Sequence, residues 1–381
     1  YSCNSHSILT SMTSPLSLTE LFLHLAGVEG VSLAERRIAD TVIAVLRDAD
    51  VRVVEDGSAA ILGGTAGNLL CFPPDFRAGS PAIMLTAHLD TVESTAALRP
   101  VVDATTIRSD GSTILGADNR MGLAVLVETL RAVVREKIAH RNFFVVFTVG
   151  EETGLFGAGT VDVSPFAPTG AYVFDCSKRP GYYIRECVGL HTFTADFIGK
   201  AAHAGVAPEE GVSAIRMACA AISKLRLGRV DPDTTANVGR IRGGEALNAI
   251  PAHATIEGEV RSYLVDRIKD ELQIIEQTLQ TSAGGLGRVE FRSREEFVPF
   301  TLQAGSPLLV HLEHAMRSVG LTPKGIRYTG GSDANKYNAK GFPAVNIGIG
   351  AQKPHSHEEF LLIDDLMNSS ALALALVREE A

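Results

Sequence analysis

The chain of 381 residues is 45% hydrophobic and 21% charged, a composition that excludes a disordered chain and suits a globular protein long enough for two domains. Its formal net charge of -9, without any run of basic residues, argues against nucleic acid or a membrane surface as a partner and favours a small ligand. Five cysteines without a CxxC pair argue against a disulfide framework and indicate a reducing compartment, so we expect a cytoplasmic location.

The N-terminal segment YSCNSHSILTSMTSPLS has neither a cationic start nor an apolar core of signal-peptide length. No apolar run in the chain approaches the roughly 20 residues that span a bilayer. We therefore expect neither export nor membrane insertion. Because Met12 opens the segment that soon becomes helical, an upstream extension is an open alternative for residues 1–11.

The first part of the chain alternates between helix and strand patterns. Residues 16–28 and 32–51 carry apolar side chains at helical spacing, which predicts two helices. The segments PAIMLTAHLD and RNFFVVFTVGEE are short apolar runs that end in polar residues, as buried strands do. This alternation predicts an α/β layer architecture, in which functional side chains gather beyond the carboxyl ends of parallel strands.

The middle of the chain has a different rhythm. Helices are predicted over residues 213–227 and 266–283, and strands over 234–244, 253–263 and 288–297. Helices over 308–320 and 361–380 and a buried strand within 342–350 then return to the style of the first part. We therefore predict a discontinuous catalytic domain, residues 1–187 and 301–381, with an inserted α+β domain, residues 188–300, and hinges near Val188 and Phe300.

His88 and Asp90 end the strand TAHLD. Residues two apart in an extended chain share a face, and a histidine ligand commonly donates its second ring N–H to a carboxylate. We interpret His88 as a metal ligand and Asp90 as the group that orients it. The alternative is a strand-end histidine followed by an aspartate that caps the next helix.

Asp118 lies in a Gly-flanked turn before an apolar helix, where an aspartate is usually an N-cap. Two neighbouring metal ions, however, repel each other, and a carboxylate that places one oxygen on each can hold them together. Asp118 is therefore the candidate bridge.

Glu151 and Glu152 follow a strongly hydrophobic strand, where unpaired carboxylates would be costly. They could open the next helix, whose N-terminal dipole favours acids. In the functional interpretation, Glu152 binds a metal ion and Glu151 acts as the general base.

Two further positions complete the set. Asp175 ends the strand AYVFD and suits a second ligand on the His88 metal, while the soft ligand Cys176 beside it has no second cysteine nearby in the sequence. In KPHSHEEF either His355 or His357 could ligate, and spacing alone does not choose.

The ordered segments TAHLDTV, GADNRMGLA, GEETGLFGA, VFDCS, AAHAG, GGSDAN and HSHEEF resemble the dizinc peptidases and amidohydrolases that include peptidase T, carboxypeptidase G, aminoacylase and succinyl-diaminopimelate desuccinylase. The similarity runs from about Leu18 to the C-terminus. It implies a zinc-exopeptidase catalytic domain, with a mixed sheet flanked by helices, and an inserted ferredoxin-like α+β lid. In many family members this lid also forms a homodimer.

The resemblance implies two divalent ions, zinc or alternatively cobalt or manganese. His88 and Asp175 would hold one ion, Glu152 and His355 the other, and Asp118 would bridge them. Glu151 would be the general base for a metal-activated water, and Asp90 would keep its orienting role. The family's H[ST]xxE segment matches His355 through Glu359, which selects His355 over His357.

Three positions in the lid region resemble residues that contact the substrate in the family. His203 matches the histidine that reaches the substrate carbonyl oxygen, where a donor would stabilise the oxyanion. Asn248 and Arg261 match further substrate contacts, although Arg261 could equally be a surface charge on a strand. The segment GGSDAN, which holds Asn335, matches the family segment that lines the substrate end.

The residue at position 175 indicates which branch of the family, and therefore which activity, the chain resembles. The position of Asp175 usually holds glutamate in the deacylases and aspartate in the aminopeptidases and dipeptidases. The sequence therefore predicts a peptidase T-like aminopeptidase for short peptides, although VFDCSKRPG departs from peptidase T. The alternatives are an N-acyl amino acid amidohydrolase of the same family and an inactive peptide-binding homologue.

Overall fold

The computed structural model describes residues 16–285 and 287–379, so the alternative raised for residues 1–11 lies outside the described part. The chain divides into two compact units. Of the described residues, the first unit comprises 16–182, 311–323 and 347–379, and the second comprises 183–285, 287–310 and 324–346. The predicted domain boundaries at residues 188 and 300 stay a prediction.

Four helices of the first unit lie where the apolar periodicity predicts them, although the first turn of one of these, α8 (Pro307–Ser318), belongs to the second unit. The predicted N-terminal helices are α1 (Leu18–Ala26) and α2 (Arg36–Arg47), and the predicted C-terminal ones are α8 (Pro307–Ser318) and α10 (Ile363–Val377). A capping box between Ser17 and Glu20 starts α1. The remaining helices are α3 (Ser58–Leu62), α4 (Ala117–Glu136), α5 (Phe156–Thr160) and the short η1 (Ser164–Phe166).

A mixed sheet forms the centre of this unit, with the strand order β1-β2-β6-β3-β7-β16. The strands are β1 (Arg52–Glu55), β2 (Leu69–Phe72), β3 (Ala82–His88), β6 (Phe143–Thr148), β7 (Pro168–Cys176) and β16 (Ala344–Gly348). β3 runs parallel to both β6 and β7, so the carboxyl ends of these three strands meet at one edge. A small sheet, β17 (Phe360–Leu362), β5 (Thr106–Ser109) and β4 (Pro100–Val102), completes the unit.

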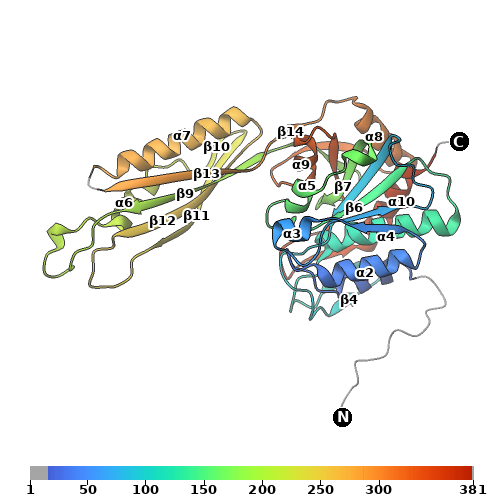
Figure 1. The fold of residues 1–381 in the computed structure, drawn as a ribbon, viewed down its shortest axis with the longest axis horizontal. Coiled ribbons are helices and arrows are strands. Elements are labelled where there is room, and N and C mark those ends of the chain that lie inside the picture. The colour runs from blue at the N-terminus through green and yellow to red at the C-terminus, as the bar shows by residue number, and fades with distance from the viewer. Residues whose placement is uncertain (1–15, 286, 380–381) are drawn as a thin grey trace, which may run out of the picture. The chain divides into compact units, whose positions relative to one another are not determined.

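Helices cover the sheet and bury its apolar strands. α4 packs on β3 and β7, and α1, α2 and α10 pack in turn against α4 (Figure 1). Every residue of β3 and β6 is buried, as the continuous apolar runs of both strands predict. This rigid layer determines where the polar residues at the strand ends lie.

The second unit contains a five-stranded antiparallel sheet with the order β10-β11-β12-β9-β13. Its strands are β9 (Gly189–Ile198), β10 (Gly228–Asp231), β11 (Thr234–Gly243), β12 (His253–Ser262) and β13 (Arg288–Phe297). Two helices, α6 (Ala214–Ile222) and α7 (Val265–Ser282), pack against this sheet over one apolar core (Figure 1). The order β9-α6-β11-β12-α7-β13 is the ferredoxin-like pattern, which confirms the predicted α+β fold of this region.

Shorter elements complete the second unit. β8 (Tyr182–Cys187) pairs with β14 (Phe300–Thr301) and β15 (Lys324–Tyr328), and α9 (Asp333–Ala339) and η2 (Pro208–Glu210) are its remaining helices. Across the described residues of both units, no helix is long and apolar enough to cross a bilayer.

Candidate metal centre

The polar residues that end three parallel strands lie at one edge of the main sheet. His88 is the last residue of β3, Glu151 and Glu152 follow β6, and Asp175 is the penultimate residue of β7. Asp118 lies at the start of α4 with a non-helical backbone, φ -88° and ψ 103°. His355, in the loop before β17, adopts the left-handed φ of 61°, a conformation that is uncommon for a residue other than glycine.

The side chains of these residues converge. His88 Nε2 lies 3.3 Å from Asp118 Oδ1 and 3.3 Å from Asp175 Oδ1. His355 Nε2 lies 3.1 Å from Glu152 Oε2 and 3.6 Å from Asp118 Oδ2. The two oxygens of Asp118 therefore face different histidines, which is the geometry that a bridging carboxylate requires.

Three overlapping groups of side chains each bring their donor atoms within 4.8 Å of one another. The first is His88, Asp118 and Asp175, the second is Asp118, Glu152 and His355, and the third is His88, Glu151 and Glu152. The donors are imidazole nitrogens and carboxylate oxygens, a set that suits zinc, cobalt or manganese. The residues thus fit two neighbouring ions that share Asp118, and the assignment of each residue to an ion stays a prediction.

The carboxylates of this site raise the pKa values of its two histidines. Burial by itself would lower the pKa of His88, but its hydrogen bonds with Asp118 and Asp175 raise that pKa well above the ordinary value. Hydrogen bonds with Asp118 and Glu152 raise the pKa of His355 to about 10. Burial raises the pKa of Glu152 to about 7. In the metal-free protein, protonated histidines therefore provide the positive charge that bound ions would supply.

Asp90 supports more of the site than its spacing predicts. Its fully buried carboxylate accepts hydrogen bonds from Ser32 Oγ at 2.6 Å, Glu151 N at 3.0 Å and Glu152 N at 3.1 Å. The ring atom His88 Nδ1 lies 3.0 Å from the Asp90 carbonyl oxygen and 3.4 Å from its carboxylate. Asp90 thus holds the turn of the two glutamates as well as the histidine ring.

Two buried charged residues near Asp90, Glu35 and Arg120, are not indicated by any sequence pattern. Glu35 Oε1 accepts hydrogen bonds from Gly150 N at 2.9 Å and Leu33 N at 2.8 Å, and so holds the peptide just before Glu151. Burial, followed by repulsion from Asp90, raises the pKa of Glu35. The buried Arg120 donates to the carbonyl oxygens of Leu89 and Val28 and attracts both carboxylates. The positive charge of Arg120 partly offsets the free-energy cost of burying the carboxylates of Asp90 and Glu35.

The two residues that competed with the predicted ligands have other partners. His357 Nδ1 lies 3.2 Å from the carbonyl oxygen of Gly111, and His357 Nε2 lies 3.4 Å from Glu93. Burial raises the pKa of the Cys176 thiol to about 12, so this residue stays neutral near pH 7. His355 lies in one of the groups of candidate metal-binding side chains, and its role as the ligand in place of His357 stays a prediction.

The predicted substrate residues His203 and Asn248 lie in two paired loops of the second unit. Ala204 N donates to Asn248 O at 2.9 Å, and Ile250 N donates to Ala202 O at 2.8 Å. The exposed His203 accepts hydrogen bonds at Nδ1 from Gly205 N and Val206 N, both at 3.2 Å. A neutral ring with this arrangement carries its proton on Nε2, where it can donate to a ligand.

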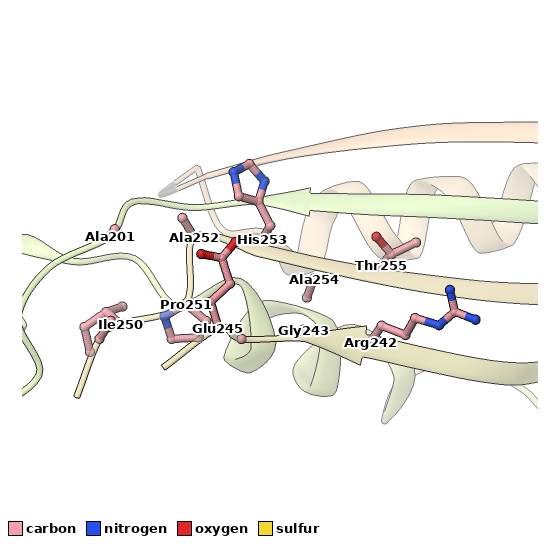
Figure 2. A pocket seen from close by; sticks show the side chains of 12 residues that line it. Ala201, Arg242, Gly243, Glu245, Ile250, Pro251, Ala252, His253, Ala254 and Thr255 are labelled. Atoms are coloured by element: carbon pink, nitrogen blue, oxygen red, sulfur yellow. The ribbon is translucent and has the colours of Figure 1, made fainter. Parts of the chain in front are cut away.

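A hollow of about 500 Å³ adjoins these loops. In Figure 2, Glu245 and His253 lie near the middle of the lining, and Arg242 and Thr255 lie further along β11 and β12. The hollow lies wholly within the second unit. None of the predicted site residues lines it.

Arg261 and Asn335 make internal contacts in the second unit. Arg261 donates from Nε and Nη2 to Glu259, at 2.9 and 3.1 Å, and from Nη1 to the carbonyl oxygen of Thr329 at 3.0 Å. Asn335 is fully buried and donates to the carbonyl oxygens of Val188 at 3.1 Å and Val298 at 2.9 Å. Asn335 thus ties together both ends of the inserted segment, while the substrate contact of Arg261 stays a prediction.

Two regions of the chain match known families. Residues 186–285 match the family described as "Peptidase dimerisation domain", and residues 99–179 match the family described as "M42 glutamyl aminopeptidase".

Three proteins resemble nearly the whole chain. The uncharacterized protein YqjE of Bacillus subtilis (strain 168) is 33% identical over 371 residues, which are 97% of this chain and 100% of YqjE. The crystal structure of aminopeptidase PepT from Bacillus cereus ATCC 10987 is 33% identical, with a TM-score of 0.85, and the match covers 94% of this chain and 97% of that chain. The crystal structure of a tripeptidase from Staphylococcus aureus is 32% identical, with a TM-score of 0.88, over 94% and 96% of the two chains.

Proposed function

Because this chain belongs to the metallopeptidase family of peptidase T and is a metal-dependent exopeptidase, we propose that it is an aminopeptidase that acts on short peptides with a free amino terminus. One observation carries this proposal. The donor atoms of His88, Asp118, Asp175, Glu152 and His355 form two groups that share Asp118, with Glu151 beside them. The aspartate at position 175 supports the aminopeptidase branch over the deacylases.

The chain's own residues have distinct roles in the proposed reaction. When bound, the two ions would polarise the peptide carbonyl and make water nucleophilic near neutral pH. Glu151, whose Oε2 lies 4.0 Å from His88 Nε2, would take the proton of the attacking water and deliver it to the departing nitrogen. Asp90 and Glu35 keep this base in place because they hold the backbone of residues 150–152.

His203, in the lid, would donate a hydrogen bond to the substrate carbonyl oxygen. Its Nδ1 is satisfied by two backbone N–H groups, so Nε2 is the atom that can donate. A donor to the oxyanion of the tetrahedral intermediate typically contributes about 10²–10³-fold to the rate. Asn248, whose backbone carbonyl oxygen accepts a hydrogen bond from Ala204 N, and Arg261 are the proposed substrate contacts.

Three finer properties belong to the same proposal. Zinc is the proposed metal, with cobalt and manganese as alternatives. The chain would form a homodimer through the lid, whose residues 186–285 match the dimerisation family and expose Leu247 and Val206 to solvent. The location would be the cytoplasm, in keeping with the free cysteines of the described residues, which are Cys71, Cys176, Cys187 and Cys219.

Peptide hydrolysis tests the proposed activity. Free tripeptides are compared with their N-acetylated and N-succinylated counterparts, with zinc, cobalt or manganese, for the unmodified chain and Glu151→Gln. We expect release of the amino-terminal residue from free peptides only, and its loss in the variant although the metals still bind. Cleavage of acylated substrates alone would identify an amidohydrolase, and no cleavage with any metal would indicate a peptide-binding homologue.

A further inference from the structure

A second buried glutamate contacts the proposed metal centre and is not accounted for by the ligands or the base. Glu359 is 1% exposed and lies four positions after His355. Its Oε2 accepts a hydrogen bond from Gly116 N at 2.6 Å, and its Oε1 accepts one from Asp118 N at 3.0 Å. One carboxylate therefore joins the loop that carries His355 to the turn that carries Asp118.

The turn that Glu359 holds has an irregular backbone. Gly116 adopts the left-handed φ of 73°, and Asp118 has non-helical angles at the start of α4. The first N–H groups of a helix lack partners within the helix and need an outside acceptor. Glu359 supplies that acceptor to two of them at once, which sets the direction in which the Asp118 side chain leaves the backbone.

A carboxyl group can accept both of these hydrogen bonds because each of its two oxygens has an acceptor lone pair. A glutamine of the same shape has one acceptor oxygen, and its NH₂ group would face the second backbone N–H. The turn would have to shift to relieve this contact. Such a shift would move the Asp118 oxygens, which now lie 3.3 Å from His88 Nε2 and 3.6 Å from His355 Nε2.

We propose that Glu359 is a positioning residue that places the Asp118 carboxylate between the two metal positions and couples it to the His355 loop, so that both ions bind tightly only when Glu359 is present. The inference rests on the proposed dinuclear site. It assigns no contact between Glu359 and a metal ion or the substrate.

Titration of the metal-free protein with Co²⁺, followed by visible absorption, tests the inference. We expect two ions per chain and, for Glu359→Gln, binding that is about 10–100-fold weaker, the usual effect of losing a group that orients a ligand. Glu358→Gln changes the neighbouring side chain, which is 76% exposed, and is expected to bind Co²⁺ as the unmodified chain does. Asp365→Asn, a second control, changes a carboxylate that is 1% exposed and accepts hydrogen bonds from Arg179.

A double-substitution cycle shows whether Glu359 acts through Asp118. If it does, Asp118→Asn and the combination Asp118→Asn/Glu359→Gln have the same Co²⁺ affinity, because the bridge is already lost. Additive losses in the combined variant, or unchanged binding in Glu359→Gln alone, would overturn the inference.

Hydrogen exchange on the unmodified chain tests the same point even if the variants do not fold. The Gly116 and Asp118 amides should be protected in the metal-free protein, because Glu359 holds them without an ion. Protection that arises only after metal addition would refute the inference. Fewer than two bound Co²⁺ in the unmodified chain would remove both the dinuclear site and this inference, whereas equal binding by Glu359→Gln would remove the inference alone.

Discussion

Replacing Asp90 with asparagine tests most directly how Glu151 and Glu152, the proposed base and a proposed metal ligand, are held in place. The Asp90 carboxylate accepts hydrogen bonds from Ser32 Oγ and Glu152 N at Oδ2 and from Glu151 N at Oδ1. Asparagine keeps the shape but has one acceptor oxygen. The amide orientation that keeps more hydrogen bonds places this oxygen where it accepts from Ser32 Oγ and Glu152 N. The NH₂ group then faces the N–H of Glu151, and two donors cannot form a hydrogen bond.

The expected cost follows from these contacts. One hydrogen bond to a buried charge is lost and one buried N–H is left unpaired, which together lower the free energy of unfolding by about 2–4 kcal/mol. Loss of the attraction to Arg120 adds to this cost, and relief of the repulsion with Glu35 offsets part of it. Because the displaced peptide carries Glu151, kcat should also fall by about 10–100-fold.

Urea unfolding of the metal-free protein measures the change in the free energy of unfolding, and tripeptide hydrolysis at saturating metal measures the change in kcat. Ser32→Ala removes one of the accepted hydrogen bonds and should cost about 1 kcal/mol. Asp48→Asn on the exposed end of α2 is the control for the substitution itself. The reasoning is refuted if Asp90→Asn unfolds like the control and retains its kcat.

Four further predictions concern the base, the metals, the pH dependence of stability and the release of protons on metal binding. Glu151→Gln should lower kcat by about 10²–10⁴-fold while the protein still binds two ions, and a variant that loses the metals instead would show that Glu151 is a ligand. Chelation should abolish hydrolysis and lower the midpoint of thermal unfolding, and added zinc, cobalt or manganese should restore both, because ligands that bind only the native state stabilise it. The pKa of His355, raised to about 10, means that its protonated form stabilises the metal-free protein below pH 6.5 and that this contribution is lost as the pH rises towards 10. Urea unfolding of the chelated protein between pH 6.5 and 10 should show this decline, and His355→Gln should flatten it. At pH 8, metal binding should release at least one proton, since a ligand histidine must be neutral. Calorimetry in buffers of different ionisation enthalpy measures that release.

The sequence predicts the chemistry of the site because its main signals are local. Hydrophobic runs that end in His88, Glu151 and Asp175 indicate strand ends, and parallel strands bring their ends to one edge. The helical periodicity of residues 213–227 and 266–283 predicts the two helices of the inserted domain in the same way. These signals depend on residues a few positions apart.

The support of the site depends instead on contacts between distant residues. Glu359 and Gly116 are separated by 243 positions, Glu35 and Gly150 by 115, and Ser32 and Asp90 by 58. The H[ST]xxE segment includes Glu359 but does not show which groups it contacts, and no local pattern points to Glu35 or Ser32. Their roles become visible only when the fold buries them, because a buried carboxylate must find donors that an exposed one can leave to water.

The sequence by itself thus determined the residue types at the strand ends, the main helices and buried strands, and the metal chemistry that those residues allow. The tertiary structure decided which oxygen of Asp118 faces His88 and which faces His355, that Asp90 also holds the two glutamates, and that Arg261 is bound by Glu259. The physical reason is that periodicity and strand ends are properties of neighbouring residues, whereas the position of a side-chain atom depends on every element packed around it.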